Sequence, residues 1–473
     1  MPMKRRTKIV CTLGPAVDGK DKIRALIEAG MNVARLNCSH GDWETKERWI
    51  HWIRELSPDV SPIAILADLQ GPKFRIEELA GGELALAPGQ MVTLGKGEVD
   101  IPIEQTEILK AMTVGSRLLM GDGEIELKIT GGAMPQFTAK TINGGTLKSR
   151  KGVTLLHKVF DTPALTSKDV EDAREAVRLG VDFLALSYVK HAADAMELRR
   201  LLDRLDSTVG ICAKIETREA IKDLDNILKV VELVMVARGD MGLQMDLEEV
   251  PLMQKRIIEH CSIVGKPVIT ATQMLESMIT NPRPTRAEAT DVANAVLDGT
   301  DALMLSAETA TGQYPIESLR TMVRIAERTE PYFNHGNVER RFVERTRKDG
   351  ISHADAIAHA VAILSGLIKP AAIVTTTTSG QPPRLVSKFR PKAPILCATW
   401  NERVQRQLAV AWGVETVLVP KPSNTDETIH HAIDALLRKK RLNCGDDVIV
   451  TAGVPAGTPG NTNMILTEKV GSR

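Results

Sequence analysis

Seven charged side chains follow or end short aliphatic runs in the N-terminal two thirds of the chain, and their types could do chemistry. They are four carboxylates, two guanidinium groups and one ammonium: Asp68, Glu216, Asp240, Glu308, Arg35, Arg238 and Lys214. Any one of them alone is most simply a solvated or capping residue. Gathered in one place, they would destabilise the fold unless a ligand or a metal compensated their charges. The set therefore predicts a site for charged ligands.

Glu216 and Asp240 are the predicted metal ligands. Each ends one of two successive aliphatic runs, and neighbouring strands lie about 4.8 Å apart, so both carboxylates can reach one cation. Oxygen ligation by few protein groups suits Mg²⁺, which keeps waters and shares phosphate oxygens. The ten histidines show no HExxH or comparable spacing, so zinc is not expected.

Lys214 lies two residues before Glu216, which puts both side chains on one face of a strand. A lysine beside a divalent metal can stabilise a transferring phosphoryl group, because this chemistry needs mainly positioning and charge neutralisation. The plainer alternative is a lysine that only balances the carboxylates. The sequence holds no Walker A loop and no protein-kinase signature, so nucleotide phosphates must be held in another way.

The composition excludes several classes of function. The chain has 61 basic and 60 acidic residues, which gives no argument for binding to nucleic acid or to a membrane. No apolar stretch approaches the roughly 20 residues of a membrane span. The six cysteines are scattered without a CxxC pair, so a reduced, cytoplasmic protein is expected.

Eight aliphatic runs, most of them followed by helical periodicity, predict the framework that positions these residues. Alternating strands and helices imply a parallel sheet, and eight such units suggest a closed (β/α)₈ TIM barrel. Active sites of such barrels form at the carboxyl ends of the strands. The predicted strands are Thr7–Leu13, Asn32–Asn37, Ile63–Leu69, Asp182–Tyr188, Gly210–Glu216, Val234–Asp240, Pro267–Gln273 and Ala302–Glu308.

Two further regions depart from the barrel pattern. Residues 71–161 are rich in glycine and show period-two runs, which predicts an inserted all-β lid, a small β-barrel. Beyond residue 340 strands and helices alternate again, which predicts a separate open α/β domain. The expected division is therefore a barrel of residues 1–70 and 162–340, a lid of residues 71–161, and a C-terminal regulatory domain of residues 341–473.

The motifs together resemble those of the pyruvate kinases. These are RTKIVCTLGPA, MNVARLNCSHG, ADLQGPKFR, AKIE, VMVARGDMG and the long segment from Gly265 to Pro315, in this order. The resemblance spans the chain, including the lid and the C-terminal domain. It implies transfer of the phosphoryl group of phosphoenolpyruvate to ADP, giving pyruvate and ATP, in glycolysis. It also implies Mg²⁺ or Mn²⁺ as cofactor and a homotetramer.

The resemblance assigns roles to individual residues. Glu216 and Asp240 resemble the metal ligands, and Lys214 and Arg35 resemble the groups that grip the transferring phosphoryl from two sides. Gly239, Asp240 and Thr272 resemble the contacts to the substrate carboxylate. Protonation of the enolate maps to a relay through Ser306 and Glu308. The contacts to the nucleotide map to Pro15, Asn37, His40, Arg75 and Lys151.

One motif departs from the commonest form of the family. Many members read DTKGPE where this chain reads DLQGPK, and in those members Asn, Ser, Asp and Thr side chains bind potassium. Asn37, Ser39 and Asp68 are kept, but Leu69 cannot ligate, and Lys73 replaces the glutamate. A fixed ammonium can supply the charge of the missing cation, so a potassium-independent enzyme is expected. The alternative is that Lys73 is a plain surface lysine.

The effector and the function class leave alternatives open. The loop TTTTSG resembles the phosphate-holding loop of the family, and it could hold a sugar phosphate or a nucleotide, or be a simple turn: Thr375, Thr376, Thr377, Thr378, Ser379 and Gly380. Two other functions compete with the kinase. One is another TIM-barrel enzyme acting on phosphoenolpyruvate or pyruvate, of the aldolase or carboxylase type, and the other is a non-catalytic paralogue.

Overall fold

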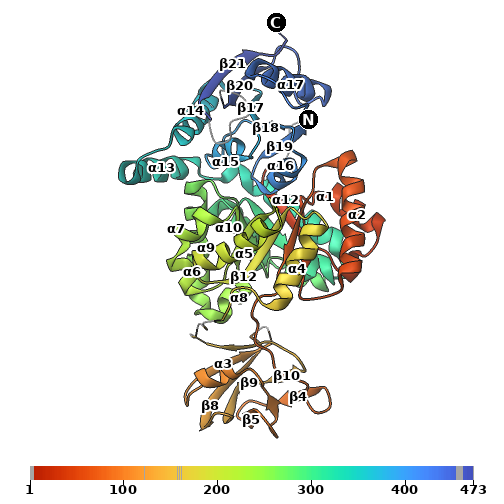
Figure 1. Cartoon of the computed structure of the whole chain (residues 1–473), viewed down its shortest axis with the longest axis vertical. Coiled ribbons are helices and arrows are strands. Elements are labelled where there is room, and N and C mark those ends of the chain that lie inside the picture. The colour runs from red at the N-terminus through yellow and green to blue at the C-terminus, as the bar shows by residue number, and fades with distance from the viewer. Residues whose placement is uncertain are drawn as a thin grey trace.

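The fold is known from a computed structural model, which describes residues 5–121, 123–156, 158, 160, 162–453 and 462–471. Figure 1 shows three parts in a row, with the barrel in the middle, the lid at one end and the C-terminal domain at the other. Two connecting segments join the lid to the barrel (Figure 1). The boundary predicted at residue 161 lies outside the described residues.

The barrel is closed and parallel, as predicted, because each of the eight aliphatic runs contains a buried strand. The order around the barrel is β1-β16-β15-β14-β13-β12-β3-β2. The strands are β1 (Lys8–Thr12), β2 (Val33–Asn37), β3 (Ala64–Asp68), β12 (Phe183–Val189), β13 (Gly210–Ile215), β14 (Leu233–Ala237), β15 (Val268–Ala271) and β16 (Ala302–Leu305).

Two predicted strands end early and are followed by helices. β16 stops at Leu305, so Glu308 lies in the helix α11 (Ala307–Ala310). β14 stops at Ala237, and the helix α8 (Arg238–Gln244) begins at once, so Asp240 lies in the first turn of a helix. At this point the Arg238 side chain donates from Nη2 to the carbonyl oxygen of Thr272 at 2.6 Å, which ties the start of α8 to the end of the neighbouring strand. Asp240 is thereby brought back over the barrel mouth.

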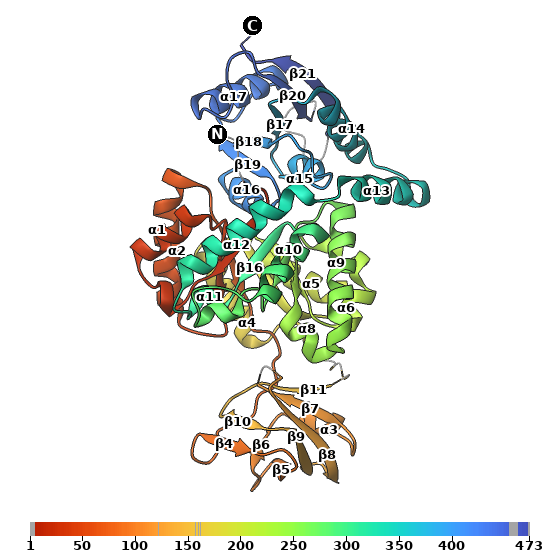
Figure 2. The ribbon, with the colours of Figure 1, turned by 180° about the vertical axis from the view of Figure 1, so that it is seen from behind.

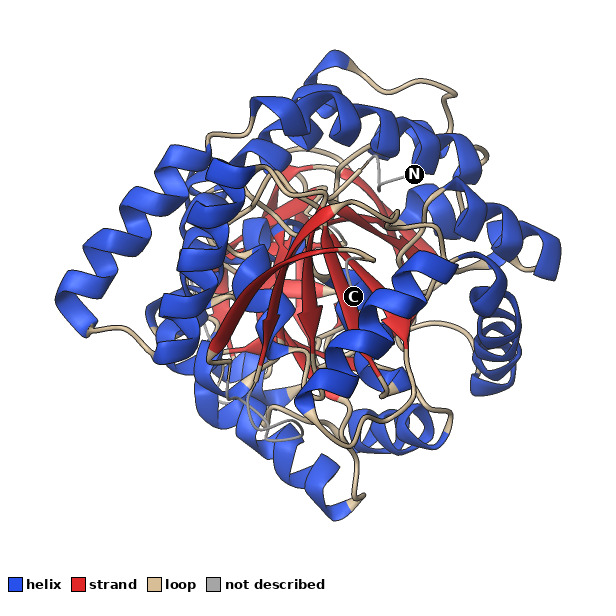
Figure 3. Ribbon diagram, turned by 90° about the horizontal axis from the view of Figure 1, so that it is seen from above, coloured by secondary structure: helices blue, strands red, loops and turns tan. Residues whose placement is uncertain are grey.

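Helices surround the strands, as Figure 3 shows from above. The start of α4 (Ser167–Arg178) is fixed by a capping box that Thr166 and Asp169 form. The helices of this layer are α1 (Lys20–Ala29), α2 (Trp43–Val60), α4 (Ser167–Arg178), α5 (Ala192–Arg204), α6 (Arg218–Lys222), α7 (Leu224–Val230), α9 (Val250–Val264), α10 (Arg286–Asp298), α11 (Ala307–Ala310) and α12 (Pro315–Thr329), with the short 3₁₀ turns η1 (Pro15–Val17), η2 (Leu247–Glu249), η3 (Glu276–Ile279) and η4 (Glu330–Tyr332).

The lid has its own aliphatic core, packed between a six-stranded sheet and a two-stranded one. Its period-two runs form strands as predicted, but it also contains a short helix that the all-β prediction missed. Its elements are β4 (Glu83–Leu86), β5 (Met91–Gly95), β6 (Ile101–Pro102), α3 (Thr106–Ala111), β7 (Arg117–Met120), β8 (Ile125–Ala133), β9 (Gln136–Asn143), β10 (Gly145–Lys148) and β11 (Val153–Leu155).

The C-terminal domain is an open α/β sheet of order β19-β18-β17-β20-β21, in which only β21 is antiparallel to its neighbour among the described strands. β21 was not predicted. The elements are α13 (His335–Asp349), α14 (His353–Ile368), β17 (Ala372–Thr376), α15 (Gln381–Ser387), β18 (Ile395–Thr399), α16 (Glu402–Gln407), η5 (Leu408–Val410), β19 (Val414–Leu418), α17 (Thr425–Arg438), β20 (Asp447–Ala452) and β21 (Met464–Lys469). Within the described residues, none of the helices has the length and apolar character to cross a bilayer.

The C-terminal domain closes the amino-terminal end of the barrel. Ala409 and Val410 of η5 belong to the apolar cluster that fills the barrel interior. Two aspartates at the starts of barrel strands accept bonds from arginines of this domain, with Arg406 bonded to Asp182 at 2.8 Å and Arg390 to Asp301 at 2.9 Å. The open end of the barrel is therefore the opposite one, which faces the lid.

Candidate active site

A cavity of about 380 Å³ lies at the carboxyl end of the barrel strands, beside the two segments that lead to the lid. The structure brings eleven of the predicted site residues to its walls: Arg35, Asn37, Ser39, His40, Asp68, Leu69, Lys73, Arg75, Lys151, Lys214 and Asp240. The size is in the range of a small-molecule site. Six of these residues carry a lysine, arginine or histidine side chain, which suits anionic ligands.

Lys214 is the centre of the charged cluster. Its ammonium lies 3.1 Å from Oε1 of Glu216 and 3.5 Å from Oδ1 of Asp68, and it donates to the Ser187 hydroxyl at 2.8 Å. Burial alone would lower the pKa of Lys214, but the surrounding carboxylates outweigh it and raise that pKa above its ordinary value. Lys214 therefore stays a cation beside the place where a phosphoryl group would sit.

Arg35 approaches the same place from β2. Its Nε donates to Oδ2 of Asp68 at 2.8 Å, and its Nη1 donates to the Thr12 hydroxyl at 3.1 Å. The strand pairing of β2 with β3 holds Arg35 and Asp68 at adjacent strand ends. A guanidinium fixed by a buried carboxylate is preorganised for an oxyanion.

Glu216 and Asp240 face the cluster from two successive βα connections. Glu216 is fully buried, and its Oε2 accepts the Tyr188 N–H at 2.9 Å. Burial raises the pKa of Glu216 to about 7, against the lowering effect of Lys214. Burial also acts to raise the pKa of Asp240, but the Lys73 ammonium, 3.0 Å from its Oδ1, lowers that pKa below its usual value.

These two carboxylates fit a hard divalent cation. Glu216 Oε1 is buried and, within the described part of the chain, receives no hydrogen bond of normal geometry, so one lone-pair direction is open. No group of three or more His, Cys, Asp or Glu side chains able to hold a metal occurs among the described residues. The donor set is thus two carboxylates, which suits Mg²⁺ because that ion takes its remaining ligands from substrate and water.

Thr272 is held in a strained conformation next to Asp240. Its φ is 68°, in the left-handed region that a β-branched residue rarely adopts. Its hydroxyl accepts the Gly239 N–H at 2.7 Å and donates to the Ala271 carbonyl oxygen at 2.6 Å. Neither Thr272 nor Gly239 lines the cavity, whereas Asp240, the third predicted contact to the substrate carboxylate, does.

Ser306 and Glu308 are not brought into the cavity. Glu308 is buried, and its carboxylate accepts the backbone N–H groups of Ser306 at 2.7 Å and Leu275 at 3.1 Å. Burial raises its pKa. The Ser306 hydroxyl is buried and has no hydrogen-bond partner among the described residues, which leaves it free to hold a water. Glu308 fixes the loop that carries this hydroxyl.

Four of the five predicted nucleotide contacts line the cavity, and Pro15 is the exception. Arg75 and Gly152 form a bridge between the outgoing and returning segments, and Lys151 precedes that bridge. Burial, followed by the positive charge of Arg75, lowers the pKa of His40, so His40 is a neutral hydrogen-bonding group at pH 7. Pro15 begins η1 and is not among the residues that line the cavity.

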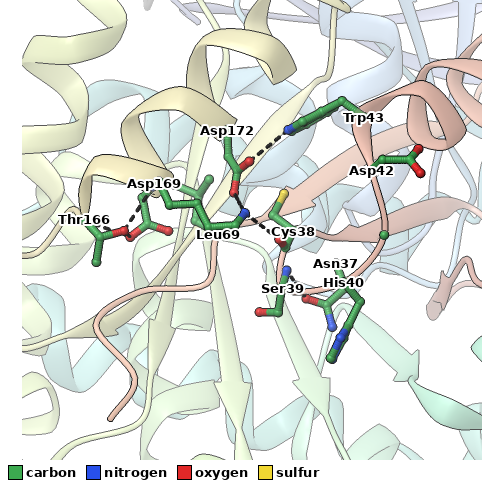
Figure 4. Close-up of polar contacts among 12 residues, drawn as sticks. Asn37, Cys38, Ser39, His40, Asp42, Trp43, Leu69, Thr166, Asp169 and Asp172 are labelled. Carbon is green, nitrogen blue, oxygen red and sulfur yellow. Dashed lines mark hydrogen bonds and ion pairs between the residues drawn. The ribbon is translucent and has the colours of Figure 1, made fainter. Parts of the chain in front are cut away.

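Two of the side-chain oxygen atoms in the predicted monovalent-cation set already accept hydrogen bonds. The Asn37 side-chain oxygen accepts the Ser39 N–H at 3.0 Å, as Figure 4 shows at the end of β2. Asp68 is bonded to Arg35. Leu69 is buried in the barrel core, and its main-chain groups pair with Ala185 and Ser187. Leu69 therefore contributes no side-chain ligand.

Ser187, Tyr188 and Lys190 belong to this region and were not predicted. Inspection of the polar residues at every strand end would have identified the first two. Ser187 and Tyr188 stand near the carboxyl end of β12, the position already examined on the other strands. Tyr188 has a φ of 55°, and its ring lies 6.0 Å from the Lys73 ammonium. Lys190 donates to the carbonyl oxygens of Phe160 and Thr162, at 3.0 and 2.9 Å, and so holds the returning segment of the lid.

The predicted effector segment lies in the C-terminal domain, where it includes the last two residues of β17 and the turn after them. Thr375, Thr376 and Thr377 are buried, and the Thr377 hydroxyl accepts the N–H groups of Ser379 at 3.2 Å and Gly380 at 2.8 Å. Thr378 is half-buried. The turn is thus closed on its own side chain.

Comparison with known proteins gives the same family for both large domains. A family model described as pyruvate kinase, barrel domain, matches residues 4–319, and one described as pyruvate kinase, alpha/beta domain, matches residues 355–466. Proteins named pyruvate kinase are similar along 98–99% of the chain: 45% identical in Geobacillus stearothermophilus, 42% in Bacillus licheniformis and 41% in Staphylococcus aureus strain MRSA252. The chain covers 80–81% of their lengths.

Proposed function

The chain belongs to the pyruvate kinase family and transfers the phosphoryl group of phosphoenolpyruvate to ADP, a reaction of glycolysis, and from this premise we propose that it works with Mg²⁺ and without potassium. The single observation that carries the proposal is the Lys73 ammonium, 3.0 Å from Asp240 in the cavity wall. This ammonium places a fixed positive charge beside Asp240 in the cavity where the anionic substrates bind.

We assign the steps of the reaction to residues that line the cavity and to others at the same ends of the barrel strands. Glu216 and Asp240 hold the divalent ion, Mg²⁺ or Mn²⁺, which supplies charge neutralisation at the phosphoryl oxygens. Arg35 and Lys214 contact those oxygens from opposite sides. Thr272 and the Gly239 and Asp240 N–H groups receive the substrate carboxylate. Ser306, oriented by Glu308, holds the water that protonates the enolate carbon.

The nucleotide occupies the space under the lid connections. Arg75 and Lys151 bind its phosphates, and His40, Asn37 and Pro15 contact its nucleoside. Membership of the pyruvate kinase family favours this function over the aldolase and carboxylase alternatives. The charges around Lys214, together with the two carboxylates proposed as metal ligands, support catalysis rather than a purely binding role.

The potassium proposal is tested by rate measurements in buffer free of sodium and potassium. With Mg²⁺ present, we expect the rate to change by less than about tenfold when potassium is added, because the ammonium already supplies the charge. A larger rise contradicts the proposal. Lys73→Met should lower the potassium-free rate by about a hundredfold, since one electrostatic contact to the transition state is lost.

A second variant restores the ligands of the commoner form. Leu69→Thr combined with Lys73→Glu should give an enzyme that potassium activates by about tenfold or more. Lys158→Glu is the matched control, because Lys158 lines the same cavity and no contact to Asp240 is described for it. It should not become potassium-dependent. Equal potassium activation of the control and of the double variant would show that any lost positive charge has this effect, and it would contradict the proposal.

Assembly, regulation and location are part of the proposal. Ile363, Leu367 and Ile368 of α14 expose 45, 75 and 44% of their surfaces at the outer side of the C-terminal domain (Figure 2), which supports association of copies into a homotetramer. Light scattering measures the mass of the assembly and so tests this part of the proposal.

All six cysteines are free thiols, which supports a cytoplasmic location. A sugar-phosphate or nucleotide effector at residues 375–380 would have to open the Thr377 turn.

A further inference from the structure

The first turn of α4 contacts both the outgoing lid connection and the loop after β2, and Figure 4 shows the side facing the loop after β2. We infer that Asp169 is a positioning residue that sets the outgoing lid connection, and that Lys168 beside it sets the nucleotide loop. The inference rests on the phosphoryl transfer assigned to the adjoining cavity. Neither residue lines that cavity, so neither is a catalytic residue.

Both carboxylate oxygens of Asp169 accept hydrogen bonds, each from a different segment of the chain. Its Oδ2 accepts the N–H and the hydroxyl of Thr166 at 2.9 and 2.7 Å, which closes the cap of its own helix. Its Oδ1 accepts the Gly71 N–H at 3.0 Å, although the two residues are 98 positions apart. Asp169 is fully buried. Helix capping needs only the first of these two sets of bonds.

Gly71 is the point at which the chain leaves the barrel for the lid, and it has little room. Its φ is 70°, and a Cβ atom there would lie 2.8 Å from Cβ of Ser187. Its carbonyl oxygen accepts the Lys73 N–H at 2.9 Å. Asp169 is thus connected through Gly71 to the residue whose ammonium contacts Asp240.

Lys168 makes the second connection from the same turn. Its ammonium donates to the Cys38 carbonyl oxygen at 2.9 Å and bonds the Asp172 carboxylate, which also accepts the Trp43 indole N–H at 2.9 Å. Cys38 stands between Asn37 and Ser39, and Trp43 begins α2. The loop with His40 and the lid connection therefore take their positions from one rigid helix.

Asp169→Ala tests the inference, because it leaves the Gly71 N–H unpaired. We expect the KM for ADP to rise by about tenfold or more, the range for a lost hydrogen bond to a charged group, while the KM for phosphoenolpyruvate changes by less than about threefold. Hydrogen exchange of the peptide that carries Gly71, followed by mass spectrometry, should become faster. Asp169→Asn retains one oxygen acceptor, so both the rise in the KM for ADP and the increase in exchange at Gly71 should be much smaller than in Asp169→Ala.

Thr166→Ala is the matched control, because it removes the cap hydroxyl and leaves the bond to Gly71. It should lower the melting temperature without changing the KM for ADP or the exchange at Gly71. Equal effects of Thr166→Ala and Asp169→Ala on both readouts would reduce Asp169 to a helix cap and overturn the inference. An unchanged Asp169→Ala enzyme would also overturn it. The exchange measurement needs no activity, so it still decides if the wild-type chain fails to phosphorylate ADP.

Discussion

Lys214→Met is expected to lower kcat by roughly 10³- to 10⁵-fold, the range found for removal of a single cation from a phosphoryl-transfer site. Methionine keeps most of the side-chain length and removes only the charge. Lys214 is the group that contacts both Glu216 and Asp68, and it stays protonated because those carboxylates raise its pKa. The kcat is measured with saturating substrates, and binding of phosphoenolpyruvate is measured separately at equilibrium.

The same substitution leaves buried carboxylates without their counter-charge, which costs stability. A fall in rate must therefore be separated from unfolding. The double variant Lys214→Met/Glu216→Gln removes the carboxylate charge that Lys214 pairs, whereas Asp68 keeps its bond to Arg35, and it should melt at a higher temperature than Lys214→Met while remaining at least as slow. Activity of either variant near that of the wild type would refute the assignment of Lys214 to the transferring phosphoryl.

Glu216→Gln is expected to raise the Mg²⁺ concentration needed for half-maximal rate by about a hundredfold, since a charged oxygen ligand is replaced by a neutral amide of the same size. The measurement is a Mg²⁺ titration at fixed free ADP and phosphoenolpyruvate. It is repeated with Mn²⁺, which accepts neutral ligands of the same geometry.

Glu197→Gln serves as the control for this titration, because Glu197 is an exposed glutamate on α5 and does not line the cavity. Its Mg²⁺ dependence should match that of the wild type. If Glu216→Gln also matches the wild type, Glu216 is not a metal ligand, and the arrangement around Lys214 must be explained by charge balance alone.

Much of the site could be predicted because strand ends in a barrel meet at one rim. Aliphatic runs reveal parallel strands, and the polar residues that end them must converge. Arg35, Asp68 and Lys214 are placed correctly by this reasoning alone. Applied to the strand ending at Tyr188, the same rule would also have identified Ser187.

What could not be predicted depends on contacts between distant segments. Asp240 lies in a helix because the Arg238 side chain bonds the next strand's connection, and no local pattern encodes that bond. Asp169 reads as an ordinary capping residue until its bond to Gly71 is seen. β21 pairs antiparallel with β20, and the alternation of parallel strands and helices gives no signal for such an added edge strand.

One measurement tests the central claim most directly: pyruvate formation from phosphoenolpyruvate by the purified chain in potassium-free buffer, with ADP and Mg²⁺ each present or absent. The account predicts rapid formation of pyruvate, with one ATP for each pyruvate, only when both are present. Pyruvate formed without ADP would contradict transfer to a nucleotide. No pyruvate until potassium is added would contradict the role given to Lys73, and none under any of these conditions would leave a protein that binds without catalysis.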